Sequence, residues 1–177
     1  MNKRGLQLGV LLKFALASVS VFAQSMQIHV YGTGKGLPQS EVISIYQDRA
    51  GYMWFGTYES GLARYDGRSF QRLTLTGGIP NGAVHEIFQD RQDRMWIGTE
   101  EGLICLRSDP ETGDTTVTVF TKDHGLPDEH VTSILQDERG VLWIGTEAGA
   151  CYFDNKGFVP RLSQRSPNNN VILSMAL

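Results

Sequence analysis

Acidic and aromatic side chains follow a Gly-Thr pair at three places in this sequence. The three loops read Tyr58-Glu59-Ser60, Glu100-Glu101 and Glu147-Ala148. Carboxylates arranged along one face can bind a cation or accept hydrogen bonds from sugar hydroxyls. Because these side chains differ between the loops, we predict a ligand-binding site formed by Tyr58, Glu59, Glu100, Glu101 and Glu147. Tyr58 is the strongest single prediction, since an aromatic residue among glutamates has no evident structural role there. The alternative is ordinary solvated loop charge.

Tryptophan and aspartate occur at equivalent positions before each of these loops. The tryptophans are Trp54, Trp96 and Trp143, and the aspartates are Asp48, Asp90 and Asp137. The tryptophans could form a platform for sugars, but residues in register on a strand are more simply explained by packing between repeats. The aspartates could bind metal, but each stands alone before a turn. We therefore predict that they cap the backbone amides of those turns.

Chemistry beyond binding finds little support in the sequence. His85, His124 and His130 vary between the repeats, and His85 falls on a predicted inner strand with no carboxylate or cysteine near it at a spacing that indicates a metal. The D-x-x-G-x-x-W pattern is reminiscent of the Asp-box of sialidases, but the arginine cluster and tyrosine nucleophile of those enzymes cannot be located. Phosphate loops, zinc spacings, G-x-S-x-G and kinase motifs are missing. We predict no catalytic residue, no metal and no cofactor.

The elements that hold these residues belong to a repeat that occurs three times. Its pattern is G-x-P-x-x-x-V-x-x-I, a large apolar residue, Q-D, a four-residue turn segment, a large apolar residue, then W-(I/F)-G-T. The copies begin at Gly36, Gly78 and Gly125. Pro38 and Pro80 are 42 residues apart, and Pro80 and Pro127 are 47 apart. A period near 40–45 residues with strand-like content is typical of β-propeller blades.

The repeat predicts an all-β chain, an incomplete β-propeller with three four-stranded blades. The blades are expected over 36–77, 78–124 and 125–166, with a polar hairpin insertion at 108–115 in the second. Residues 24–35 are expected to hold an orphan outer strand, at 27–31, and 167–177 the truncated start of a fourth repeat. A closed ring usually has 4–8 blades. The expected partners therefore include missing C-terminal blades or a second copy, and the chain is interpreted as the front of a longer protein or a truncated reading frame.

The first 23 residues are predicted to be a secretory signal peptide. Lys3, Arg4 and Lys13 precede a short apolar run, and Val21 and Ala23 are the small residues that a signal peptidase reads. Removing this segment leaves 13 basic and 19 acidic residues, a net charge of −6. An acidic, periplasmic or secreted protein is a poor candidate for binding nucleic acid or an anionic membrane. Cys105 and Cys151 lie in equivalent strands with opposite side-chain phase, so two buried free thiols are expected.

The repeat resembles that of the two-component regulator propeller family. The matching stretches are VISIYQDRAGYMWFGT, VHEIFQDRQDRMWIGT and VTSILQDERGVLWIGT; Asp93 replaces the turn glycine and Ala150 the usual leucine. The resemblance implies a periplasmic sensor that precedes a transmembrane helix and a histidine kinase or other output domain, with ligands that are often breakdown products of polysaccharides. We interpret the chain as a ligand-sensing segment and not an enzyme. The alternatives are a propeller lyase or glycoside hydrolase and a non-catalytic interaction scaffold.

Overall fold

The computed structural model describes residues 28–73, 82–154 and 156–162. The expected signal peptide at 1–23 and the expected fourth repeat at 167–177 lie outside these residues. Contacts divide the chain into two units, Met1–Val30 and Tyr31–Leu177. Of the first unit, residues 28–30 are described, and they have no regular secondary structure. Among the described residues, no helix is long and apolar enough to cross a membrane.

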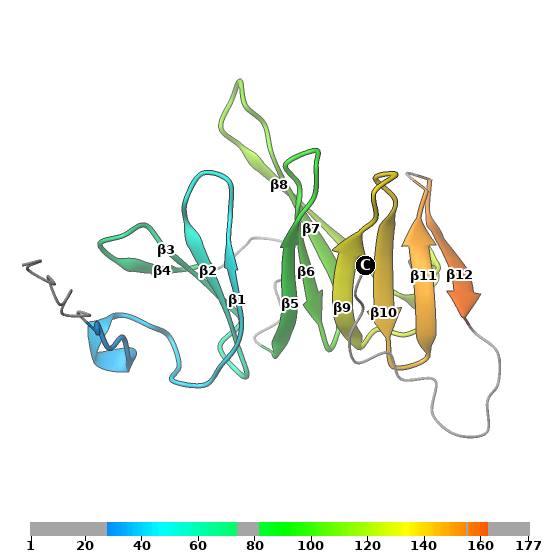
Figure 1. Ribbon diagram of the computed structural model, residues 1–177. Coiled ribbons are helices and arrows are strands. Elements are labelled where there is room, and N and C mark those ends of the chain that lie inside the picture. The colour runs from blue at the N-terminus through cyan, green and yellow to red at the C-terminus, as the bar shows by residue number, and fades with distance from the viewer. Residues whose placement is uncertain (1–27, 74–81, 155, 163–177) are drawn as a thin grey trace, which may run out of the picture. The chain divides into compact units, whose positions relative to one another are not determined.

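The second unit contains three antiparallel sheets of four strands each, which confirms the prediction of three four-stranded blades (Figure 1). Blade 1 consists of β1 (Val42–Gln47), β2 (Met53–Thr57), β3 (Leu62–Tyr65) and β4 (Phe70–Arg72). Blade 2 consists of β5 (Val84–Gln89), β6 (Met95–Thr99), β7 (Gly102–Ser108) and β8 (Thr115–Phe120). Blade 3 consists of β9 (Val131–Gln136), β10 (Leu142–Thr146), β11 (Gly149–Phe153) and β12 (Phe158–Leu162). Each strand pairs with the next along the chain.

The β7–β8 connection agrees with the sequence prediction, whereas the segment before blade 1 does not. The polar insertion forms the tip of the β7–β8 hairpin, as predicted, with Ser108 paired to Thr115. The outer strand expected over 27–31 is wrong for its described residues, because 28–32 adopt no strand. A strand needs a ladder with a neighbour, and the first ladder of the described chain begins at Val42. Tyr31 instead packs its ring against Tyr65 and Phe70. Two short 3-10 helices, η1 (Thr33–Lys35) and η2 (Lys122–His124), were not predicted.

Apolar side chains form one core layer at each boundary between blades. The boundary of blades 1 and 2 buries Trp54, Leu62, Val84, Ile87, Met95, Ile97, Ile104 and Leu106. The boundary of blades 2 and 3 buries Trp96, Leu103, Cys105, Leu126, Val131, Ile134, Leu142, Ile144, Cys151 and Phe158. Both cysteines are free, as predicted, and burial raises the pKa of Cys105 to about 11 and that of Cys151 to about 12. These thiols are therefore unreactive packing residues.

The repeated aspartate and tryptophan are joined by a hydrogen bond in every blade. The indole Nε1 donates to the carboxylate at 2.7 Å for Trp54 and Asp48, 2.7 Å for Trp96 and Asp90, and 3.1 Å for Trp143 and Asp137. The other carboxylate oxygen accepts from turn amides; that of Asp90 accepts from the amides of Gln92 and Arg94. The predicted turn caps and the predicted packing of tryptophan are confirmed. One aspartate fixes the turn and satisfies the polar edge of the buried ring.

The glycine of each W-(I/F)-G-T segment allows the next blade to approach. A Cβ atom on Gly98 would lie 2.8 Å from Val131 Cγ1, and one on Gly56 would lie 2.6 Å from the carbonyl oxygen of Val84. The turn glycine has a different role, since Gly51 and Gly140 adopt positive φ angles of 91° and 83°. Asp93, which replaces that glycine in blade 2, also adopts a positive φ of 61°. Aspartate tolerates this left-handed conformation better than most residues.

Polar contacts cross each boundary at the turn between the first two strands of a blade. Gln89 Oε1 accepts from the Arg49 amide at 2.8 Å, and Gln136 Oε1 accepts from the Arg91 amide at 2.9 Å. The Arg91 guanidinium also donates to the carbonyl oxygen of Glu138 at 2.9 Å. The aspartate of the repeat thus stabilises the turn of its own blade, whereas the glutamine also caps the turn of the preceding blade.

The outer face of blade 1 lacks such a neighbour among the described residues. Ile45 is 59% exposed, whereas its equivalents Ile87 and Ile134 are 1% and 6% exposed. On the opposite side of the described chain, Trp143 is only half-buried, whereas Trp96 is fully buried. The repeat therefore fixes the same side chains in each blade, and burial depends on whether another blade covers them.

Candidate functional site

The loops that follow the Gly-Thr pairs occupy one end of the sheets, which we call the rim. Each loop is held by the threonine hydroxyl, which donates at 2.8 Å to a carbonyl oxygen at the start of the next strand. In blade 3, the Glu147 amide donates to the His130 carbonyl oxygen at 3.2 Å, and in blade 1 the Tyr58 amide donates to Glu41 in the same way. The main chain therefore places the first loop residue beside the residue that precedes the inner strand.

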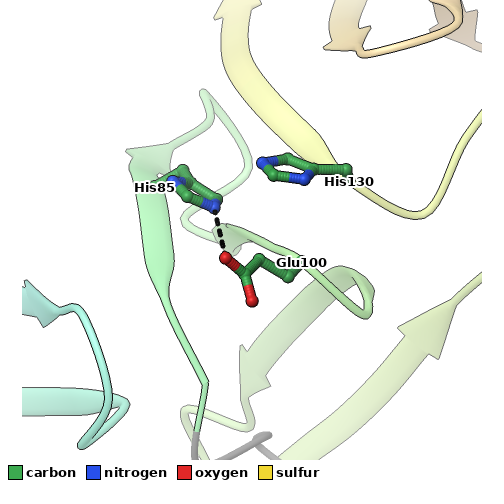
Figure 2. A group of neighbouring side chains, drawn as sticks. All are labelled: His85, Glu100 and His130. Carbon is green, nitrogen blue, oxygen red and sulfur yellow. Dashed lines mark ion pairs between the residues drawn. The ribbon is translucent and has the colours of Figure 1, made fainter.

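A β-bulge places one additional residue at this end of every inner strand. In blade 2, Val84 pairs with Thr99 and Glu86 with Gly98, so His85 is the extra residue between them. The same irregularity occurs at Ile43 in β1 and Thr132 in β9. Bulges bend a strand and re-aim side chains, and they are enriched beside functional sites. In blade 2 the bulged residue is His85, whose side chain lies at the rim (Figure 2).

Two histidines and two glutamates meet at the boundary of blades 2 and 3. His85 Nε2 lies 3.8 Å from Glu100 Oε1, and His130 Nδ1 lies 3.4 Å from Glu147 Oε1. The imidazole rings of His85 and His130 stack with centroids 4.6 Å apart and planes 20° apart. Figure 2 shows His85, Glu100 and His130 converging from two blades. We call these four residues the His–Glu cluster.

The surroundings of His85 disfavour its protonated form. Burial lowers its pKa below the usual value of 6.5, and the nearby His130 lowers it further, while the charges of Glu100 and Glu147 oppose the shift. Its Nε2 atom is shielded from solvent and has no hydrogen-bond partner. A shielded imidazole nitrogen without a partner loses the hydrogen bond that it would make with water. A ligand that accepts or supplies this contact would offset that loss.

The predicted ligand contacts divide into two groups. Glu100 and Glu147 belong to the His–Glu cluster through their histidine partners. Tyr58, Glu59 and Glu101 are also exposed, but in the described part of the chain they make no ion pair with the cluster. The amide of Glu59 donates to Gln39 Oε1 at 2.7 Å, and that of Glu101 donates to Thr99 Oγ1 at 3.1 Å. All five stay predictions as ligand contacts.

Sequence reasoning missed the histidines as partners of the glutamates. It found no carboxylate at a metal-ligand spacing from His85 in sequence, but strand pairing brings Glu100 to it across β5 and β6. The signal in the sequence was that His85 follows Val84 and His130 precedes Val131, which are equivalent valines of the repeat. His124 does not join the cluster; its Nδ1 accepts from the Thr121 amide at 3.1 Å and caps η2.

A hollow of about 610 Å³ lies away from the rim, and residues with structural roles line it. It is bordered by Trp96 and Phe153 and by two arginines, Arg94 and Arg107. The Arg94 Nε atom donates to Asp90 at 2.6 Å, and its guanidinium lies 5.0 Å from the Trp96 ring centroid. Arg94 is thus committed to the aspartate–tryptophan contact. The unpartnered His85 nitrogen makes the rim the better candidate site.

Comparison with known protein families finds a match at each of the three repeats. The model of the two component regulator propeller matches residues 36–59, 78–101 and 125–148. Each matched segment includes an inner strand, the turn that aspartate caps and the rim loop. The three blades are built on two component regulator propeller repeats. No curated protein matches the chain.

Several solved structures are similar to this protein over much of the chain. The extracellular domain of the hybrid two component system BT3049 from B. thetaiotaomicron is 30% identical, with a TM-score of 0.64, over 76% of this chain and 18% of that chain. That of BT4673 from the same organism is 27% identical, with a TM-score of 0.65, over 85% of this chain and 21% of that one. This chain therefore spans about a fifth of their length. Streptogramin B lyase, 15% identical with a TM-score of 0.51 over 70% of this chain and 41% of that one, shares the fold alone.

Proposed function

We propose that this two component regulator propeller chain is part of the ligand-sensing region of a signalling protein. The observation that carries the proposal is the 30% identity to the extracellular domain of a hybrid two component system, together with the three matched propeller repeats. The expected secretory signal at 1–23 supports a periplasmic or secreted location. The exposed Ile45 face of β1 supports contact with further blades or with a second copy.

The proposed ligand is a soluble molecule such as an oligosaccharide, bound at the rim. Tyr58 and the glutamates of the rim loops are exposed and differ between repeats, so the packing of the blades does not account for them. Carboxylates accept hydrogen bonds from sugar hydroxyls, and a tyrosine ring offers both apolar surface and a hydroxyl. Binding without turnover is proposed, because a sensor transmits occupancy rather than product.

Calorimetric titration of the chain with a panel of neutral and acidic oligosaccharides tests the proposal, with product analysis of each mixture. We expect stoichiometric binding with no new product, and at least a tenfold weaker affinity for Tyr58→Ala and Glu101→Ala. Glu111→Ala is the matched control, since Glu111 is exposed on the β7–β8 hairpin at the other end of β7. Its affinity should equal that of the wild type.

Three outcomes would contradict the proposal. Consumption of any glycan would favour a propeller lyase or glycoside hydrolase. No binding to any member of the panel would favour an interaction scaffold. Equal losses in Glu111→Ala and Tyr58→Ala would show that the binding surface is not the rim.

A further inference from the structure

The His–Glu cluster has the composition and spacing of a metal site. The ligand atoms of His85, Glu100 and His130 all lie within 4.8 Å of one another. Imidazole nitrogen and carboxylate oxygen are ligands that zinc prefers in proteins, and a set of two histidines and one carboxylate leaves a fourth coordination position open. We propose that these three residues bind a divalent transition metal ion of the zinc type at the rim.

The ligand atoms of His85 and Glu100 are already near the spacing that a bound ion requires. Tetrahedral Zn²⁺ with bonds of about 2.0–2.1 Å holds neighbouring ligand atoms about 3.3 Å apart. The separation of His85 Nε2 and Glu100 Oε1 is 3.8 Å, which is too long for a hydrogen bond and close to that spacing. The stacked rings must also turn so that their nitrogen lone pairs converge. Glu100 is on an exposed loop, so its side chain has room to adjust, and His130 is half-buried just before its strand.

The shielded nitrogen of His85 is the independent observation that favours a ligand. His85 Nε2 has no hydrogen-bond partner, and it faces Glu100 rather than the core (Figure 2). A bound cation satisfies such a nitrogen through its lone pair.

Glu147 has the position of a residue that orients a ligand. Its Oε1 atom lies 3.4 Å from His130 Nδ1. A carboxylate beside one ring nitrogen favours the proton there and leaves the other nitrogen, Nε2, to bind metal, as in carboxylate–histidine–zinc triads. Glu147 is therefore inferred to be a positioning residue rather than a ligand.

The other blade boundary shows that the repeat itself does not demand this cluster. The positions equivalent to His85, Glu100 and His130 are Ile43, Tyr58 and Ala83. Val84 and Thr99 pair as Val42 and Thr57 do, with the same bulge beside them. The same backbone thus holds no metal-binding side chain at one boundary and three at the next.

Titration of the full chain with Zn²⁺, in a preparation without a histidine tag, tests the site. We expect one equivalent to bind with micromolar or tighter affinity and to raise the unfolding temperature. Replacing Zn²⁺ with Co²⁺ should give the visible absorption of a tetrahedral or five-coordinate ion. In NMR spectra, the imidazole signals of His85 and His130 should shift, and that of His124 should not.

Variants assign the binding to these residues. His85→Gln and His130→Gln should each weaken Zn²⁺ binding at least a hundredfold, and Glu147→Gln about 10–100-fold. His124→Gln is the matched control and should bind as the wild type does. Far-ultraviolet circular dichroism without metal establishes that each variant is folded, and Glu100→Gln, which changes no volume, provides a second test at an exposed residue. Failure of the folded wild type to bind Zn²⁺, unchanged affinity in both histidine variants, or equal loss in His124→Gln would overturn the proposal.

Discussion

At the boundary of blades 1 and 2 the rim holds Ile43, Tyr58 and Ala83, and at the boundary of blades 2 and 3 the equivalent positions hold His85, Glu100 and His130. Below the rim, the two boundaries are alike: each has a buried tryptophan bound to aspartate, a glycine against the next valine and a glutamine that caps the neighbouring turn. The difference shows that packing between blades and the side chains at the rim are set by different positions of the same backbone. Repeated residues build the boundary, and the rim positions are free to vary.

Breaking the shared layer should have the largest effect. Trp96→Ala removes a fully buried ring and leaves Asp90 without its indole partner, so we expect a loss of about 3–5 kcal/mol in the free energy of unfolding. Glu100→Ala, at the exposed rim, should change it by less than about 0.5 kcal/mol. Denaturant midpoints compare the two. Equal midpoints would mean that the tryptophan does not carry the packing of this boundary.

Crowding the same layer should cost less. Gly98→Ala places a methyl group 2.8 Å from Val131 Cγ1, and we expect a loss of about 1–3 kcal/mol from overpacking. Gly157→Ala is the control, because a Cβ there would meet nothing within 4 Å. Thermal unfolding measures both, and a stable Gly98→Ala chain would show that the blades can separate without cost.

The repeated glutamine lies at the boundary of blades 2 and 3 in one case, Gln136, and on the uncovered face of blade 1 in another, Gln47. Gln136 accepts from the Arg91 amide and donates to Gly140 at 2.8 Å, so Gln136→Ala should cost about 1 kcal/mol. Gln47, on the exposed side of blade 1, makes a 3.5 Å contact with Gly51 of its own turn. Gln47→Ala should cost less than about 0.5 kcal/mol. The reverse order in urea unfolding would contradict the proposed role of the glutamine as a cap between blades.

The smallest expected effect is on pH dependence. Because burial lowers the pKa of His85 below 6.5, the unfolded chain binds more protons than the folded chain just below that value. The contribution of His85 to stability is therefore complete above about pH 6.5 and is lost as the pH falls toward the folded-state pKa. His85→Gln should lose less unfolding free energy than the wild type between neutral and mildly acidic pH, and His124→Gln should match the wild type. Coincident profiles for His85→Gln and the wild type would contradict the shift.

The sequence predicts what the repeat imposes and little of what the blades create between them. Strands, turns, the aspartate caps and the buried tryptophans follow from residues that recur at fixed spacing within one copy. The strand expected at 27–31 failed because pattern alone cannot supply a neighbouring ladder. The His–Glu cluster was missed because His85 and His130 are 45 residues apart, and only the packing of blade 3 on blade 2 stacks their rings. The bulge at His85 is a matter of register between strands, which no single strand sequence reveals.

Exchanging the rims tests the central claim most directly. The variant His85→Ile, Glu100→Tyr, His130→Ala gives the boundary of blades 2 and 3 the side chains that blades 1 and 2 carry at equivalent positions. Its thermal unfolding is measured with and without Zn²⁺. The account predicts an unfolding temperature without metal close to that of the wild type, and complete loss of the stabilisation by Zn²⁺. A chain that no longer folds, or one that Zn²⁺ still stabilises as it does the wild type, would contradict the separation of a structural layer from a binding rim.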